Sequence, residues 1–222
     1  MGNQEQIQAA FLIADLAGYT ALTDSHGDSA AVEIIDRYLE IVNNSLRDNT
    51  KLLERVGDEV LIQSESVDDI LETGVHIVEA INSENHFPSV HAGMHYGNII
   101  RKSESYYGST LNITSRIAGY ARAGQLLCSK AVIDQIHSLE NYKFYSVGEV
   151  SLKNLFEPLE LFEIQVETDL IERVFDPVCH MQLTKESAPA KLPYNEKSYY
   201  FCSYKCVELF IDNPEYYLEA EQ

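Results

Sequence analysis

The spacing of apolar residues changes repeatedly along the first 166 residues, between a helical period and short apolar runs. Short runs predict strands at 9–15, 51–64 (a hairpin of two strands), 89–100, 125–129, 143–152 and 159–166. Helical spacing predicts helices over 29–48, 66–83, 109–123 and 130–139. The segment 89–100 is expected to break into two strands at Gly97-Asn98. Because hairpins alternate with helices, the expected fold is an α+β sheet with helices mainly on one face.

The composition changes near residue 168. The segment 168–174 is acidic and predicts a linker between a first domain at 8–167 and a small second domain at 175–218. The second segment is rich in Tyr and Cys and lacks the alternation of helices and strands. A chain of 222 residues is long enough for one full domain and one small one.

The formal net charge of −19 argues against passive binding to a nucleic-acid backbone or an anionic membrane. The sequence has no apolar run of about 18 residues, so no transmembrane helix is expected. The first residues lack the basic region of a secretory signal, which predicts a cytoplasmic protein. Its cysteines are then expected to be reduced thiols or metal ligands rather than disulfides.

Two acidic residues stand next to apolar runs. Asp58 follows Gly57 in "LLERVGDEVLIQ", where Gly-Asp predicts a tight hairpin turn, and a plain turn role for Asp58 is one alternative. Asp15 ends the apolar run of "AAFLIADLAGYT", and a carboxylate buried there needs a partner. Asn112 and Arg116 are four residues apart in a predicted helix, so they share one face, although each taken alone favours a structural role on the helix surface.

The stretches "FLIADLAGYTAL", "LERVGDEVLI", "HAGMHYGNII", "YYGSTLNITSRIAGYA" and "SLKNLFEPLELFEI" occur in this order. Together they resemble the catalytic domain of the class III nucleotidyl cyclases. The resemblance implies a ferredoxin-like cyclase sheet. It also implies a reaction that joins the ribose 3′-hydroxyl of a purine nucleoside triphosphate to its α-phosphate and expels pyrophosphate, with two Mg²⁺ or Mn²⁺ ions.

The resemblance assigns roles to individual residues. Asp15 and Asp58 match the metal-binding aspartates, and Asn112 and Arg116 match the pair that orients the ribose and offsets charge on the α-phosphate. The triphosphate would lie on backbone amides before a helix, at Leu16, Ala17, Gly18, Tyr19 and Thr20. Lys153 lies near a triphosphate-contacting lysine. Because the Asn and Arg come from the partner subunit in the family, the resemblance implies a head-to-tail homodimer.

Two positions that select the base depart from the adenylyl cyclase pattern, since Glu54 and Ser105 stand where those enzymes usually carry Lys and Asp. A carboxylate accepts hydrogen bonds from guanine N1–H and N2–H₂, which favours GTP over ATP. The same departure leaves open altered selectivity, weak activity or no activity. The segment between Ile100 and Gly108 is short, and His91 replaces a common Arg and receives no role. His95 is interpreted as a strand residue.

The C-terminal stretches "FDPVCHM" and "YYFCSYKC" resemble the YHS domain, a small module associated with metals. Cys179, Cys202 and Cys206 are candidate thiolate ligands for Zn²⁺ or Cu⁺, and His180 is a candidate fourth ligand that equally well faces solvent. A packed module without metal is the alternative. Cys128 is expected to be buried in a strand. The competing function is a silent cyclase domain that serves a metal- or redox-responsive tail.

Overall fold

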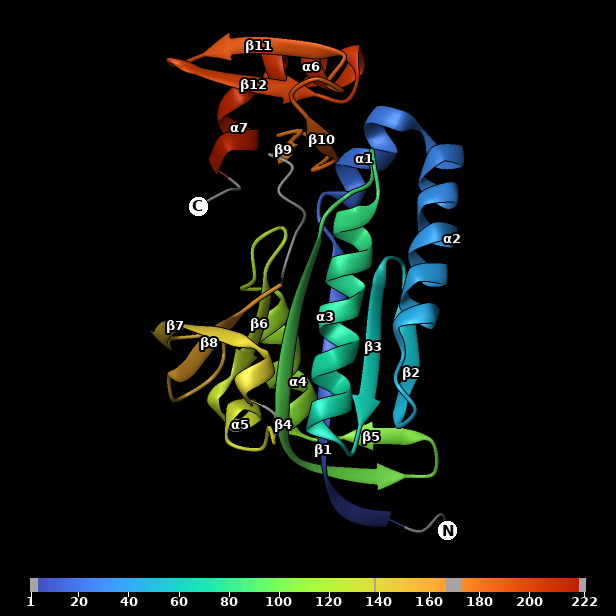
Figure 1. The fold of residues 1–222 in the computed structure, drawn as a ribbon, viewed down its shortest axis with the longest axis vertical. Coiled ribbons are helices and arrows are strands. Elements are labelled where there is room, and N and C mark those ends of the chain that lie inside the picture. Colours follow the sequence, from blue (N-terminus) through green and yellow to red (C-terminus); the bar gives the residue numbers. More distant parts are fainter. Residues whose placement is uncertain (1–3, 138, 167–172, 220–222) are drawn as a thin grey trace.

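The computed structural model describes residues 4–137, 139–166 and 173–219. The first domain is built on one mixed sheet, shown in Figure 1. Across the sheet the strands run in the order β2 (Thr50–Val56), β3 (Glu59–Ser64), β1 (Gln4–Leu16), β4 (Val90–Lys102), β6 (Leu126–Ser129), β8 (Leu159–Gln165) and β7 (Lys143–Val150). A short strand, β5 (Ser105–Tyr107), pairs with β4. The β4–β6 pair is parallel and its neighbours are antiparallel.

Two long helices, α2 (Asp28–Ser45) and α3 (Val67–Ser83), lie across one face of the sheet and enclose the main core. The short helix α5 (Lys130–Ile133) packs on this face too, and the 3-10 turn η1 (Leu139–Asn141) follows it. On the other face, α4 (Ser109–Ala118) covers β4 and β1. This arrangement confirms the expected α+β class with helices mainly on one face.

Strand β4 is continuous through Gly97-Asn98, so the expected break there is wrong. Strand β1 is 13 residues long and pairs with β4 from Gln4↔Lys102 to Leu16↔Val90. This long pairing satisfies the backbone groups of the two strands that face each other, which outweighs the local turn preference of Gly-Asn. The chain reverses later, at Ser103, whose φ is +55°. The helix expected over 130–139 is also shorter, since α5 ends at Ile133.

The alternation of side chains along β1 decides where Asp15 emerges. Ala10, Leu12 and Ala14 point into the core beneath α2 and α3, whereas Ala9 and Phe11 pack on the opposite face. Asp15 has the same parity as Ala9 and Phe11 and therefore leaves the sheet on the α4 side. The phenol of Tyr38 on α2 donates to the carbonyl of Ala14 at 3.0 Å and fixes this end of the strand.

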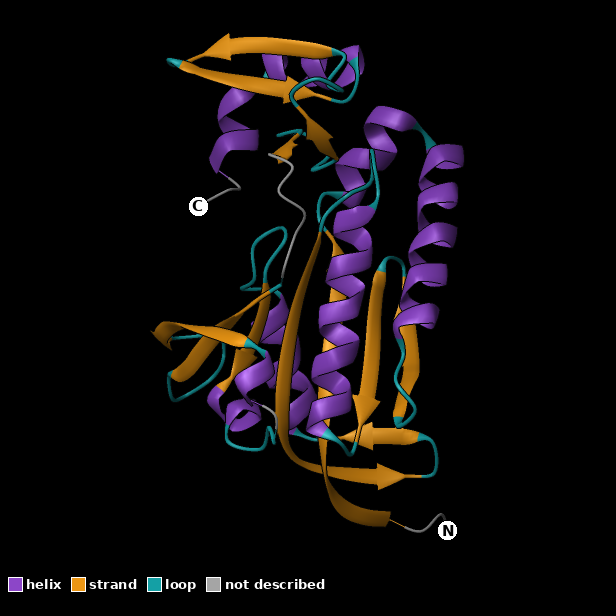
Figure 2. Cartoon of the chain, viewed as in Figure 1, coloured by secondary structure: helices purple, strands orange, loops and turns teal. Residues whose placement is uncertain are grey.

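The C-terminal module combines two small sheets with two short helices, as Figure 2 shows. Its elements are β9 (Arg173–Phe175), β10 (Gln182–Thr184), β11 (Ala190–Tyr194), β12 (Lys197–Phe201), α6 (Tyr204–Asp212) and α7 (Pro214–Glu219). Phe201 and Phe210 are fully buried at its centre. Residues 167–172, which hold most of the expected linker, lie outside the described residues, so the domain boundaries stay a prediction.

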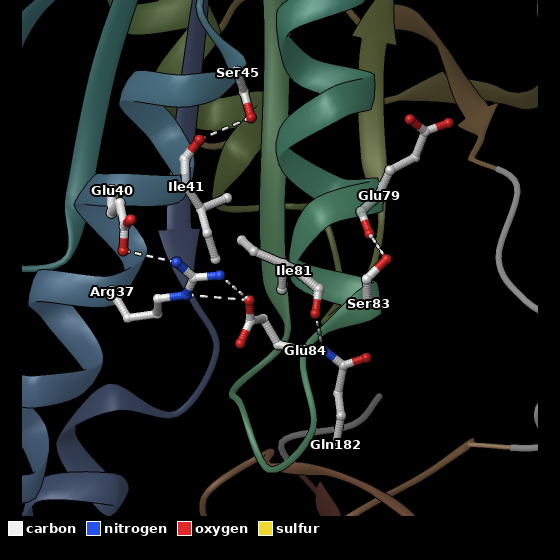
Figure 3. A network of polar contacts seen from close by, with 9 residues as sticks. All are labelled: Arg37, Glu40, Ile41, Ser45, Glu79, Ile81, Ser83, Glu84 and Gln182. Atoms are coloured by element: carbon white, nitrogen blue, oxygen red, sulfur yellow. Dashed lines mark hydrogen bonds and ion pairs between the residues drawn. The ribbon is translucent and has the colours of Figure 1, made fainter.

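The module docks on the end of the first domain that carries α1 (Tyr19–His26). Its backbone pairs with the loop before β4, where the amide of Gln182 donates to the carbonyl of Phe87 at 2.9 Å and the amide of Ser89 to the carbonyl of His180 at 3.3 Å. The Gln182 side chain also donates to the carbonyl of Ile81 at 3.4 Å, near the Arg37–Glu84 ion pair (Figure 3).

Candidate functional site

Asp15 and Asp58 lie against one another at the end of the sheet. Asp15 is the penultimate residue of β1, and Asp58 stands in the turn between β2 and β3 after Gly57, whose φ is +65°. The two carboxyl groups are close enough to share a hydrogen-bonded proton. The structure therefore brings together the two residues that the sequence analysis proposed as metal ligands.

Asp15 and Asp58 are partly buried carboxyl groups close enough for their negative charges to repel each other. Burial, followed by the charge of Asp15, raises the pKa of Asp58 to about 7. Burial also raises the pKa of Asp15. His91 lies beside the pair, with Nε2 3.7 Å from Asp15 Oδ2, and burial lowers the pKa of its imidazole. The His91 imidazole is thus neutral at neutral pH and does not offset the charge of the two carboxyl groups.

The pair suits a hard divalent cation. Asp15 Oδ1 is buried and receives no hydrogen bond from any described residue, although a buried carboxylate oxygen normally has a partner. Mg²⁺ and Mn²⁺ prefer carboxylate oxygens, and a cation between Asp15 and Asp58 would satisfy the orphan oxygen and remove the repulsion. The residues present therefore fit such an ion.

The candidate triphosphate loop runs from Leu16 to Thr20, next to the pair. One of its five amides is already used, because that of Ala17 donates to the carbonyl of Ser89 at 2.8 Å. The amides of Gly18, Tyr19 and Thr20 open α1, where no carbonyl one turn earlier can accept them. These three are the amides available to an anion.

A cavity of about 480 Å³ opens above Asp15, Asp58 and this loop, and the C-terminal module forms its other wall. The wall includes Pro177, Val178, His180 and Tyr217. The contact at Gly18 is close, since a Cβ built there would lie 2.5 Å from His180 Cδ2. The tail thus adjoins the candidate phosphate site directly.

Asn112 and Arg116 both point away from the core of the chain. Their side chains are exposed on α4 and make no hydrogen bond or ion pair with another described residue. The charged groups that act on Asp15 and Asp58 are each other, Glu59 and His91, and Arg116 is not among them. Within one chain, the structure does not bring this pair to the aspartates.

The candidate side chains for binding the base and the triphosphate, Glu54, Ser105 and Lys153, are exposed and lie on different elements. Glu54 lies on β2 beside a β-bulge, Ser105 begins β5, and Lys153 stands in the loop between β7 and β8.

His95 lies in β4, as expected, with Nδ1 2.7 Å from Ser129 Oγ, and burial lowers its pKa to about 4. Cys128 is buried in β6, and burial raises its pKa to about 12.

Cys179, Cys202 and Cys206 form a compact cluster in the tail, with sulfur–sulfur distances of 3.3, 3.6 and 3.8 Å. All are free thiols. Hydrogen bonds from the thiols of Cys179 and Cys202 lower the pKa of Cys206. Asp176 is fully buried beneath the cluster and accepts from the amides of Val178 and Cys202 at 2.8 and 2.7 Å, which ties the two cysteine-bearing segments together.

The structure adds a residue that the sequence analysis missed. His26, at the end of α1 in the first domain, places Nε2 3.2 Å from Cys202 Sγ and 3.9 Å from Cys206 Sγ. The three sulfurs and His26 all lie within 4.8 Å of one another, whereas His180 is outside this group. A single histidine in "TDSHGD" carries no motif, so only the docking of the tail could reveal it.

Comparison of the sequence supports both domains. The family model described as YHS domain matches residues 174–221. The chain is also similar to a pH-sensitive adenylate cyclase of Mycobacterium tuberculosis, at 23% identity over 72% of this chain and 41% of the relative. The chain thus spans about two fifths of the length of that relative.

The fold has close counterparts among solved structures. Adenylate cyclases of Trypanosoma brucei in their monomeric state match with a TM-score of 0.68 at 17% identity, over 72% of this chain and 88% of theirs. The guanylyl cyclase Cya2 matches with a TM-score of 0.63 at 18% identity, over 77% of this chain and 97% of its own. No helix among the described residues is both long and apolar enough to cross a bilayer. The first domain therefore has the fold of the adenylate and guanylate cyclases, and a YHS domain follows it.

Proposed function

We propose that this protein is a nucleotidyl cyclase that converts a purine nucleoside triphosphate to its 3′,5′-cyclic monophosphate and pyrophosphate. The observation that carries the proposal is the Asp15–Asp58 pair, with its buried orphan oxygen, beside the free amides at the start of α1. This arrangement offers a place for divalent cations next to a place for phosphate. The similarity to named cyclases supports the same reading.

Each candidate residue would have a distinct role in the reaction. Asp15 and Asp58 would hold two Mg²⁺ or Mn²⁺ ions, which supply a Lewis acid for the ribose 3′-hydroxyl and positive charge for the phosphates. The amides of Gly18, Tyr19 and Thr20 would bind the triphosphate at the helix N-terminus. Arg116 would offset the charge that develops on the α-phosphate, and Asn112 would orient the ribose.

The exposed position of Asn112 and Arg116, away from the aspartates, supports a head-to-tail homodimer in which each site takes the aspartates of one chain and α4 of the other. Glu54 and Ser105 favour GTP as the substrate, because a carboxylate accepts from the guanine edge. ATP is the competing substrate, since the named sequence relative is an adenylate cyclase.

The first test is a product assay. Purified protein is incubated with Mn²⁺ and each of ATP, GTP, CTP and UTP, and we expect a cyclic purine nucleotide, with GTP the better substrate. Asp58→Ala should lower the rate by at least about 100-fold because the cation site is lost. If folded dimeric protein makes no cyclic product from any nucleotide, the cyclase proposal fails and the metal-responsive tail becomes the leading function.

The second test addresses the shared site. Asp58→Ala and Arg116→Ala should each be inactive alone, since each removes one half of both sites. A mixture of the two should recover about a quarter of the wild-type activity, because about half of the randomly assorted dimers are mixed and each has one intact site of two. Mixing either variant with Asp58→Ala/Arg116→Ala double-variant chains is the control. No recovery in a mixture that does exchange subunits contradicts the head-to-tail arrangement.

A further inference from the structure

The cysteine cluster of the tail has the dimensions of an occupied tetrahedral site. Five of the six separations between ligand atoms run from 3.2 to 3.9 Å, and the sixth, between His26 and Cys179, is within 4.8 Å. A tetrahedral Zn²⁺ ion with three sulfur ligands and one imidazole has ligand–ligand separations of about 3.5–3.8 Å. The four side chains therefore need only small shifts to surround one ion.

We propose that His26 and the three cysteines form a Cys₃His site for Zn²⁺ that clasps the YHS module onto helix α1 of the first domain. The ion would thus join two domains rather than staple the tail alone. Three ligands, Cys179, Cys202 and Cys206, come from the tail, and the fourth, His26, comes from 153 residues earlier in the chain.

The surroundings support a built site. Cys179 and Cys206 are fully buried, and Cys202 and His26 are partly exposed, so an ion has an entry route on one side. The Asp176 carboxylate holds the backbone next to Cys179 and Cys202 through hydrogen bonds to their segments. Metal ligands commonly depend on such supporting hydrogen bonds for their orientation. Asp176 is thus a positioning residue for the site.

The presence of His26 decides between the two ions considered from the sequence. Three thiolates alone also suit Cu⁺, a soft ion, whereas a set of three thiolates and one imidazole at tetrahedral spacing suits Zn²⁺. His180 does not compete for the fourth position, because its ring lies against Gly18 rather than in the cluster.

The proposed site would also restrain the movement of helix α1. Leu22, one turn before His26, is 1% exposed and belongs to the apolar core of the module. The helix is therefore held by the tail at Leu22 through packing and at His26 through the ion. Its first residue, Tyr19, follows the Gly18 loop of the candidate phosphate site.

Metal binding by the full chain is the direct test. Metal-free protein is titrated with Zn²⁺, and separately with Co²⁺ as a spectroscopic substitute, in the presence of excess Mg²⁺. We expect one tight Zn²⁺ per chain and a Co²⁺ spectrum with the absorption of a tetrahedral site and of thiolate ligands. His26→Ala should weaken Zn²⁺ binding by about 10- to 100-fold or more and alter the Co²⁺ spectrum.

Two further variants keep the test independent of folding defects. His26→Cys supplies a fourth thiolate and should restore tight Zn²⁺ binding with stronger thiolate absorption. His180→Asn, which tolerates the positive φ of 54° at that position, should bind Zn²⁺ as the wild type does. A Zn²⁺ affinity that is unchanged in His26→Ala but lost in His180→Asn overturns the proposal, as does tight Cu⁺ binding without tight Zn²⁺ binding.

The interdomain clasp has its own readout in hydrogen exchange. In the wild type, Zn²⁺ addition should slow hydrogen exchange of the α1 amides by at least about tenfold, because opening of the helix then requires release of the ion. In His26→Ala, this protection of α1 should be absent. Protection confined to the tail in the wild type contradicts the clasp even if the ion binds.

Discussion

The position of Asp58 in the proposed cation site has a cost in folding stability. Its pKa of about 7 in the fold exceeds its usual value of 3.8, so the folded protein holds this proton more tightly than the unfolded chain does. Without a divalent cation, folding stability should therefore fall as the pH rises from about 4 to about 7. Asp58→Asn removes the repulsion and should raise the free energy of unfolding at pH 8 by about 1 kcal/mol, a discounted value because Asp58 is partly exposed.

Chemical denaturation in a chelator at pH 4.5 and pH 8 measures this effect. The gain from Asp58→Asn should be large at pH 8 and small at pH 4.5, and Mn²⁺ should stabilise the wild type at pH 8 but not the variant. Asp48→Asn, at an exposed position, is the matched control and should show no such pH dependence. An equal gain at both pH values would mean that the two carboxylates do not repel each other.

Glu54 is the residue on which the proposed base choice depends. The double change Glu54→Lys with Ser105→Asp replaces the guanine acceptor with groups suited to adenine. The ratio of kcat/KM for GTP to that for ATP should fall by at least about tenfold, because a mismatched hydrogen-bonding group in a site strongly disfavours its former substrate. Steady-state rates with both nucleotides measure the ratio, with Lys153→Ala as a control that should weaken both equally. An unchanged ratio removes Glu54 from base selection.

At the scale of elements, the junction between β1 and α1 joins the two candidate sites. Gly18 has a φ of +71°, and a Cβ there would meet His180 and the backbone of Cys179. Gly18→Ala should lower the free energy of unfolding by about 2–3 kcal/mol, from backbone strain of about 1 kcal/mol and the displaced tail. Gly124→Ala, with a φ of +84° and open space around it, should show the strain alone. Equal losses in urea denaturation would mean that the tail does not press on this loop.

The same junction shows which features the sequence predicts and which it does not. The period of apolar residues gave most strands and helices, and the Gly57-Asp58 turn and the end of β1 are local enough to place both aspartates. The continuity of β4 through Gly97-Asn98 depends on its long pairing with β1, which local turn chemistry does not encode. His26 joins the cysteines only through the docking of two domains, and a lone histidine carries no spacing signal for that contact.

At the scale of the whole molecule, the tail connects the proposed Zn²⁺ site to the proposed nucleotide site. The proposed Zn²⁺ clasp fixes the end of α1, and the start of α1 presents the amides proposed to bind the triphosphate. Loosening the helix adds an ordering cost to nucleotide binding. His26→Gln should therefore raise the KM for the nucleotide about three- to tenfold at saturating Mn²⁺, with a smaller change in kcat.

Steady-state kinetics of the Zn²⁺-loaded wild type and variant measure this coupling, and exposed His137 provides the matched control. His137→Gln, at a site paired with Asp68 on α3, should leave both constants unchanged. A lower KM with a higher kcat in His26→Gln would contradict the expectation. Because the tail forms one wall of the cavity over Asp15 and Asp58, that result would mean that the clasp holds the tail across the site as an obstruction.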